Sequence, residues 1–174
     1  LKALRAAAGA PLVALLGDVE AAVREAAARR LAEAGLPQGQ AVLRGVIERG
    51  GPDGLRAYAL LRRSGAGAAP DLLRRAQGAV EKILQRGSVS ERLQALGSLA
   101  DMPAREVLPL LQRAMADPAV SVRLRVAELA FALARLGESA AVEILRVLSG
   151  DDDRTVRARA ASQLALLAQR SAPP

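Results

Sequence analysis

Apolar residues recur along the chain in five blocks that share the period of an α-helix. Each block has an arginine near its start, and the positions −1, +3, +4, +7 and +8 relative to that arginine lie on one face of a helix. Of the 25 residues at these positions 22 are apolar, the exceptions being Arg63, Ser64 and Glu91. No strand-like alternation accompanies them. The pattern predicts five amphipathic helices, anchored at Arg24, Arg56, Arg92, Arg123 and Arg157.

A further apolar segment precedes each of these helices. Glycine and proline mark the joints between segments, with proline near helix starts and glycine just past helix ends, which is the usual asymmetry. We therefore expect a first helix in every block, giving antiparallel helix pairs. The predicted first helices are 11–16, 38–49, 70–86, 103–116 and 138–149.

The five blocks repeat at a nearly constant interval. Successive anchor arginines are 32, 36, 31 and 34 residues apart, a spacing typical of solenoid repeats. The fold class predicted is all-α, an α-solenoid of about five antiparallel helix pairs in a single domain over 1–170, with 171–174 as a tail or linker. The expected repeats are approximately 10–35, 38–66, 69–101, 103–136 and 138–170.

In three repeats an aspartate stands six residues before the anchor arginine. An aspartate just ahead of a helix accepts hydrogen bonds from backbone N–H groups, and its negative charge is stabilised by the positive end of the helix dipole. An arginine on the apolar face needs a partner, and its planar fork suits a carboxylate. We predict a structural ladder in which the aspartate of one repeat contacts the arginine of the next. Its members are Asp18, Arg24, Asp117, Arg123, Asp151 and Arg157.

Gly50 and Arg86 occupy the aspartate position in the second and third repeats. The ladder is interrupted there, and looser packing is expected around those helices.

The ladder motifs resemble the HEAT-repeat family, and within it the bacterial HEAT-like repeats also found in phycobilin lyases. The resemblance covers nearly the whole chain and is strongest in the first, fourth and fifth repeats. It implies an armadillo-like superhelix whose second helices line the concave side. The matching residues are Asp18 with Val23-Arg24, Asp117 with Val122-Arg123, and Asp151 with Val156-Arg157.

The amino-acid composition disfavours several kinds of metal site and catalytic site. The sequence contains no Cys and no His, which disfavours a zinc site and the commonest nucleophile–base pairs. The run Asp151-Asp152-Asp153 lacks the spacing and distal Glu of an EF-hand. We therefore expect no catalytic residues, no metal and no cofactor, and we predict that the protein is not an enzyme.

The net charge of +7 makes nucleic acid an alternative partner. Only Lys2 and Lys82 are lysines, and with the abundance of Ala, Gly and Leu this composition is typical of a GC-rich bacterial genome. One Tyr and one Phe provide no platform for base stacking. The positive charge is thus weak evidence for nucleic-acid binding.

The helix face opposite the core is the candidate binding surface. Its residues at position +2, and one at +6, include Arg and the single Tyr, both enriched at binding hot spots. The favoured function is a protein–protein interaction scaffold that binds another protein or peptide through this face; a solvated helix face is the competing interpretation. An accessory or lyase-like role is a second alternative, although no chromophore pocket is evident. The candidate partner-binding residues are Tyr58, Arg62, Gln94, Arg125 and Arg159.

The two ends of the chain suggest further contacts. The stretch LKALRAAAG resembles the remains of another helix, and the last pair carries a broad apolar stripe (residues 142–148). We expect a piece of a larger protein, or self-association through the solenoid ends. No apolar stretch is long enough to span a membrane, and the first residues lack the h-region of a signal peptide, which favours a cytoplasmic location over secretion.

Overall fold

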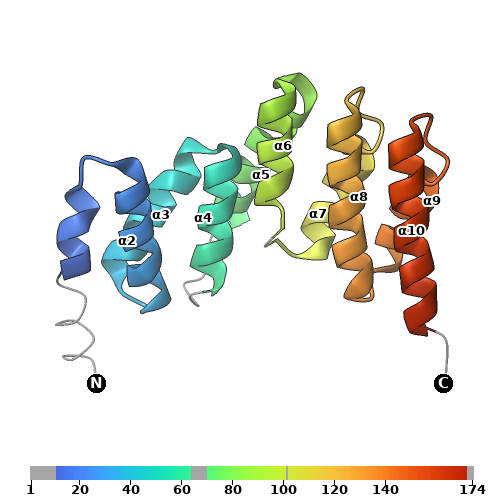
Figure 1. Cartoon of the computed structure of the whole chain (residues 1–174). Helices are drawn as coiled ribbons and strands as arrows, with labels where there is room; N and C mark the ends of the chain where they lie inside the picture. Colours follow the sequence, from blue (N-terminus) through green and yellow to red (C-terminus); the bar gives the residue numbers. More distant parts are fainter. Residues whose placement is uncertain (1–10, 64–69, 101, 172–174) are drawn as a thin grey trace. The chain divides into compact units, whose positions relative to one another are not determined.

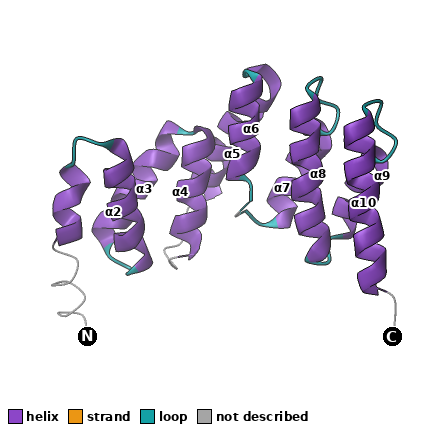
Figure 2. Ribbon diagram, viewed as in Figure 1, coloured by secondary structure: helices purple, strands orange, loops and turns teal. Residues whose placement is uncertain are grey.

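The computed structural model describes residues 11–63, 70–100 and 102–171. In these residues helices alternate with short loops and turns, and there is no strand (Figures 1 and 2). Residues 11–14 are helical and lead into the short 3-10 helix η1. The all-α prediction is confirmed. The elements are η1 (Leu15–Gly17), α2 (Ala21–Glu33), α3 (Pro37–Arg49), α4 (Gly51–Arg63), α5 (Pro70–Arg86), α6 (Val89–Ser98), α7 (Ala104–Ala114), α8 (Val120–Arg135), α9 (Ser139–Leu148) and α10 (Arg154–Ser171).

The chain divides into two compact units, Leu1–Ile83 and Leu84–Pro174, called unit 1 and unit 2. The boundary falls inside α5, the first helix of the predicted third repeat. The single domain over 1–170 and its five repeat boundaries stay a prediction.

Unit 1 is built around α2, which packs against η1, α3 and α4, while α3 also packs on α4 (Figure 1). Gly39 marks the closest approach of α3 to α2. A Cβ added there would lie 2.5 Å from the Leu31 Cβ and 2.6 Å from the Ala28 carbonyl oxygen. Only glycine permits this spacing. The core side chains include Ala27, Ala28, Leu31, Ala32, Leu43, Val46, Ile47, Leu55, Ala59 and Leu61.

Unit 2 is centred on α8, which packs against α6, α7, α9 and α10. In Figure 1, α8 and α10 stand side by side with α7 and α9 behind them. The predicted apolar face of α8 is buried as expected, since Val122, Val126, Ala127 and Ala130 are each 0% exposed. The facing helices contribute Val107, Leu110 and Leu111 from α7, Ala141, Ile144, Leu145 and Leu148 from α9, and Val156 and Ala160 from α10.

The third repeat departs from its predicted face at Glu91. This residue is exposed and forms a capping box with Ser88 at the start of α6. The Ser88 N–H donates to Glu91 Oε2 at 2.7 Å, and the Glu91 N–H donates to Ser88 Oγ at 3.3 Å. The charged residue therefore satisfies helix-end groups and takes no place in the core.

The looser packing expected for the second and third repeats does not extend to the core faces of α4 and α6. Leu55 and Leu96 are fully buried, and Ala59 and Leu99 are each 2% exposed. The apolar residues of those helices suffice to fill the interior without the missing aspartates.

The fifth repeat also differs from expectation. Ala161 and Ala165, predicted on the apolar face of α10, are exposed, while Leu164 is partly exposed. Gln163 is buried instead, at 6% exposure. The equivalents of Ala161 and Leu164 on α8 are Ala127 and Ala130, which are fully buried, and α8 packs against α10. Within the described residues no helix follows α10, so its equivalent face stays open.

Asp–Arg contacts and a candidate partner-binding surface

The six-residue spacing has a local explanation in the way the anchor arginine of the first, third, fourth and fifth repeats folds back over the first helical turn. Its Nη1 donates to carbonyl oxygens of the loop that leads into its own helix. These contacts are Arg24 to the oxygens of Asp18 and Val19 at 2.7 and 2.9 Å, Arg92 to Gly87 at 2.5 Å, Arg123 to Asp117 and Pro118 at 2.7 and 3.2 Å, and Arg157 to Asp151 and Asp152 at 2.5 and 2.7 Å.

The aspartate at the start of the motif closes the same loop from the other side. Its carboxylate accepts the backbone N–H two residues ahead, which is an Asx turn. The aspartate and arginine together hold the loop at a fixed angle to the helix. The contacts are Asp18 Oδ1 with Glu20 N at 2.9 Å, Asp117 Oδ1 with Ala119 N at 2.8 Å, and Asp151 Oδ1 with Asp153 N at 2.8 Å.

Arg123 and Asp151 join two consecutive repeats. Arg123 Nε donates to Asp151 Oδ2 at 2.7 Å and Nη2 donates to Oδ1 at 2.9 Å, so the guanidinium grips both carboxylate oxygens. The two side chains are only 13% and 8% exposed. The hydrogen bonds from Arg123 lower the pKa of Asp151, and the same bonds raise the pKa of Arg123.

Arg92 and Asp117 form the equivalent contact one repeat earlier. Arg92 Nη2 donates to Asp117 Oδ1 at 3.1 Å, and the side chains are 13% and 7% exposed. Nε lies 2.8 Å from Oδ2 without the alignment of a hydrogen bond. This ion pair is therefore close but geometrically poorer than the one between Arg123 and Asp151.

The direction of these contacts differs from the expected one. The aspartate meets the arginine of the preceding repeat, whereas the sequence suggested the next repeat. Each contact needs an arginine followed by a repeat that carries the aspartate. Arg24 is followed by Gly50 at that position, and within the described residues it keeps only its loop carbonyls. Arg56 instead pairs with Asp53 on its own helix, at 3.3 Å, where both side chains are about half exposed.

The predicted partner-binding residues fall in different surroundings. Tyr58 is 6% exposed and lies in the core of unit 1, so it offers almost no surface to a partner. Arg62 of α4 is exposed. In unit 2, Gln94 and Arg159 are exposed, and the Arg125 side chain is 36% exposed.

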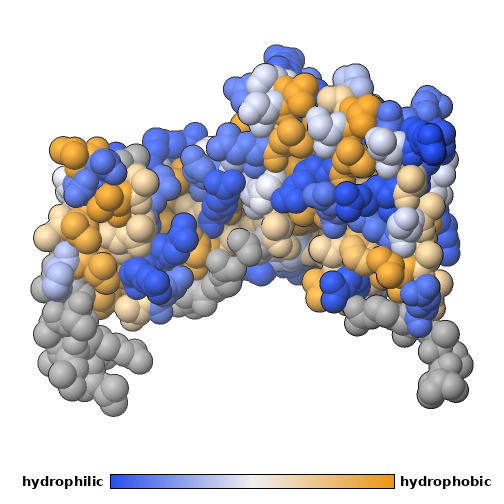
Figure 3. Space-filling model, viewed as in Figure 1, coloured by the Kyte–Doolittle hydropathy of each residue, from blue (hydrophilic) through white to orange (hydrophobic). Residues whose placement is uncertain are grey.

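Three of these residues share position +2 on helices that pack together. Gln94 lies on α6, Arg125 on α8 and Arg159 on α10, and α8 packs against both neighbours. Arg125 Nη1 lies 3.0 Å from Glu128 Oε2. Arg159 lines an open depression of about 420 Å³ with Thr155, Ala158 and Ser162. Hydrophilic and hydrophobic side chains alternate over the face that α8 and α10 present in Figure 3.

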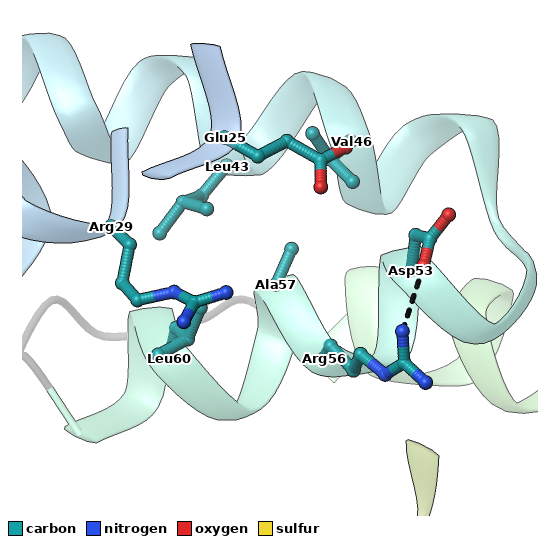
Figure 4. Close-up of a pocket in the computed structure, with 8 residues that line it drawn as sticks. All are labelled: Glu25, Arg29, Leu43, Val46, Asp53, Arg56, Ala57 and Leu60. Carbon is teal, nitrogen blue, oxygen red and sulfur yellow. Dashed lines mark hydrogen bonds and ion pairs between the residues drawn. The ribbon is translucent and has the colours of Figure 1, made fainter. Parts of the chain in front are cut away.

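A second hollow lies in unit 1 between α2, α3 and α4, and no sequence motif predicts it (Figure 4). Its volume is about 70 Å³, with Leu43 and Val46 of α3 on one side. An acidic and a basic residue stand on each of the other two helices. The remaining lining residues are Glu25, Arg29, Asp53, Arg56, Ala57 and Leu60. Because they come from three helices, no single stretch of sequence signals the pocket.

Comparison with known families decides what this architecture is. The family model described as HEAT repeats matches residues 76–165, more than half of the chain. The chain belongs to the HEAT-repeat family. Its all-α fold is therefore the solenoid class built from HEAT helix pairs. No curated protein and no solved structure matches the chain.

Among the described helices, none has the length and apolar character needed to cross a bilayer. In the described part of the chain, no group of three or more Asp and Glu side chains is placed to hold a metal ion.

Proposed function

We propose that this HEAT-repeat protein is a non-enzymatic interaction module that binds an acidic peptide or helix across α6, α8 and α10. HEAT repeats in general mediate protein–protein interaction. The observation that carries the proposal is the alignment of Gln94, Arg125 and Arg159 at one register position on three packed helices. A row of this kind presents a continuous surface on rigid elements, which suits an extended or helical partner.

Charge supports an acidic partner. Arg92 and Arg123 are neutralised by ion pairs inside unit 2. Arg159 is exposed and has no acidic partner among the described residues. Arg125 has only an exposed pair on its own helix, worth a few tenths of a kcal/mol. Both guanidiniums can therefore turn to a carboxylate on a partner at low cost.

The surface also offers apolar area. Leu166 of α10 is 50% exposed, and in a helix it shares a face with Arg159 and Ser162. We infer a partner that places an apolar side chain on Leu166 and acidic groups beside the two arginines.

Nucleic acid is the competing partner. Unit 2 holds 12 Arg against 10 Asp and Glu, whereas unit 1 holds 13 Lys and Arg against 8 acidic residues. Most of the net positive charge thus lies outside the proposed surface. The small net charge of unit 2 therefore favours binding of a peptide with a few well-placed carboxylates over binding of a phosphate backbone.

The proposal is tested by selecting peptides from a displayed random library and measuring their affinity by fluorescence anisotropy. We expect selected peptides to be rich in Asp and Glu, and Arg125→Glu with Arg159→Glu to weaken binding at least about tenfold. Arg105→Glu is the matched control, because Arg105 lies on α7 with its side chain 82% exposed. Equal binding by both variants would contradict the proposed surface. Selective, salt-sensitive binding of random duplex DNA would favour the competing partner.

A further inference from the structure

The open face of α10 corresponds in motif position to a face of α8 that is buried in unit 2. Ala127 and Ala130 on this face of α8 are fully buried, and α8 is the helix that packs against α10. Their equivalents Ala161 and Leu164 lie on a stripe that is exposed or partly exposed. The stripe consists of small and aliphatic residues, which permit the close approach of another helix. Its members are Ala161, Leu164, Ala165 and Ala168.

Arg157 of α10 has part of its hydrogen-bonding capacity unused among the described residues, beside this open apolar face. Its Nη1 bonds two loop carbonyls, just as Arg123 Nη1 does. In Arg123 the rest of the guanidinium grips Asp151 of the following repeat. In Arg157 the equivalent Nε and Nη2 have no acceptor within the described part of the chain, and the residue is exposed.

Asp18 is the complementary half of such a contact. It occupies the same motif position as Asp117 and Asp151, which receive Arg92 and Arg123. Among the described residues the carboxylate of Asp18 accepts only the Glu20 N–H. Apolar side chains near it in the sequence are exposed as well: Val13 is 38%, Leu15 40% and Val19 95% exposed.

We propose that a second copy of this chain docks head to tail on α10. Residues 11–33 of that copy, which include η1, Asp18 and α2, cover the α10 stripe, and its Asp18 carboxylate accepts hydrogen bonds from Arg157. The contact reproduces between copies the geometry that Arg123 and Asp151 have within one chain. The charges are complementary, and of the three motif aspartates Asp18 is the one whose carboxylate lacks an arginine partner in the described residues. The contact is heterologous, so repeated copies form either a closed ring or an open filament.

This docking surface is distinct from the proposed peptide-binding surface. Ala161 and Arg159 lie on different sides of α10, about 160° apart around the helix axis at 100° per residue. Peptide binding and self-association are therefore separable by mutation.

The test is sedimentation velocity of the full chain over a concentration series. We expect the mean sedimentation coefficient to rise with concentration. Ala161→Glu should weaken association at least about tenfold, because it places a charge in the apolar contact. Ser162→Glu, at an exposed neighbouring position outside the stripe, is the matched control and should leave association unchanged.

A charge swap tests the polar half of the contact. Arg157→Asp and Asp18→Arg should each abolish association, and the double variant should restore it. Circular dichroism checks the folding of these three variants, and if the reversals unfold the chain, Ala161→Glu alone decides. A chain that stays monomeric throughout the series, or one whose association Ala161→Glu leaves unchanged, overturns the proposal. Folded charge-reversed variants that associate as before overturn it too.

Discussion

Arg123 and Asp151 lie 28 residues apart in the sequence, and their side chains form a two-point ion pair, at 2.7 and 2.9 Å, that is almost closed to solvent. The same arginine also bonds the loop carbonyls of its own repeat. One side chain thus fixes the loop at the start of α8 and ties it to the loop that precedes α10. All three copies of the motif share the bond to the loop carbonyls, whereas within the described residues Arg123 alone among them also binds the aspartate of the next repeat.

Removing the charge of Asp151 should destabilise unit 2. Asp151→Asn keeps an oxygen for the Asp153 N–H but leaves the Arg123 guanidinium nearly buried without its counter-charge. The expected loss is about 3 kcal/mol of unfolding free energy, measured by urea denaturation followed by circular dichroism. Asp53→Asn is the control, because the exposed Asp53–Arg56 pair should contribute less than about 1 kcal/mol.

The contribution of Asp151 should depend on pH with a definite sign. Arg123 lowers the pKa of Asp151 in the folded state, so the stabilisation is present above the ordinary carboxyl pKa of about 3.9. It is lost as the pH falls below that value and through the lower folded pKa. The difference in unfolding free energy between the wild type and Asp151→Asn should be constant near neutrality and shrink in acid. A difference that grows in acid would contradict the assignment.

Gly39→Ala should destabilise unit 1 although alanine is the better helix former. The added methyl group would lie 2.5 to 2.6 Å from Leu31 Cβ, the Ala28 oxygen and the Ala32 nitrogen, so α2 and α3 must separate. We expect a loss of about 1–3 kcal/mol. Gly45→Ala on the same helix meets only the end of Arg49, at 3.9 Å, and should stabilise by about 0.5–1 kcal/mol. Thermal unfolding of the two variants should shift in opposite directions.

The capping box at the start of α6 should be measurable by itself. Ser88→Ala removes the acceptor of the Glu91 N–H and the hydroxyl that donates to the Glu91 carboxylate, which keeps the backbone N–H of residue 88. The expected cost is about 1 kcal/mol. Ser139→Ala is a suitable control, because Ser139 is the first residue of α9 and the N-cap position is held by Glu138. Equal costs in chemical denaturation would show that the capping box contributes nothing.

The sequence sufficed to predict the helices because their apolar period is strong and proline and glycine mark their ends. The spacing of Asp151 and Arg157 indicated that the two types of residue work together. It could not indicate direction, because the motif contains an aspartate and an arginine in every full copy and either neighbour could supply the partner. Only the packing of α8 against α10 determines that Arg123 binds the aspartate of the following repeat, Asp151.

Burial at equivalent positions was harder to predict. Tyr58, Arg125 and Arg159 share position +2, yet Tyr58 is buried and Arg159 is exposed. Along α4 the residues Ala57 and Ala59 on either side of Tyr58 are also buried, so that helix is covered over a wider arc than α10. How much of a helix its neighbours cover depends on the packing of several elements, and no local pattern encodes it.

The most direct test of the link between consecutive repeats is a double-mutant cycle on Arg123→Gln and Asp151→Asn. Loss of the loop carbonyl contacts by Arg123→Gln cancels in the cycle, so the coupling energy reports the side-chain pair alone. The predicted result is that the double variant is more stable than the sum of the single losses implies, by about 1–3 kcal/mol. Losses that simply add would contradict the claim that this pair joins the two repeats.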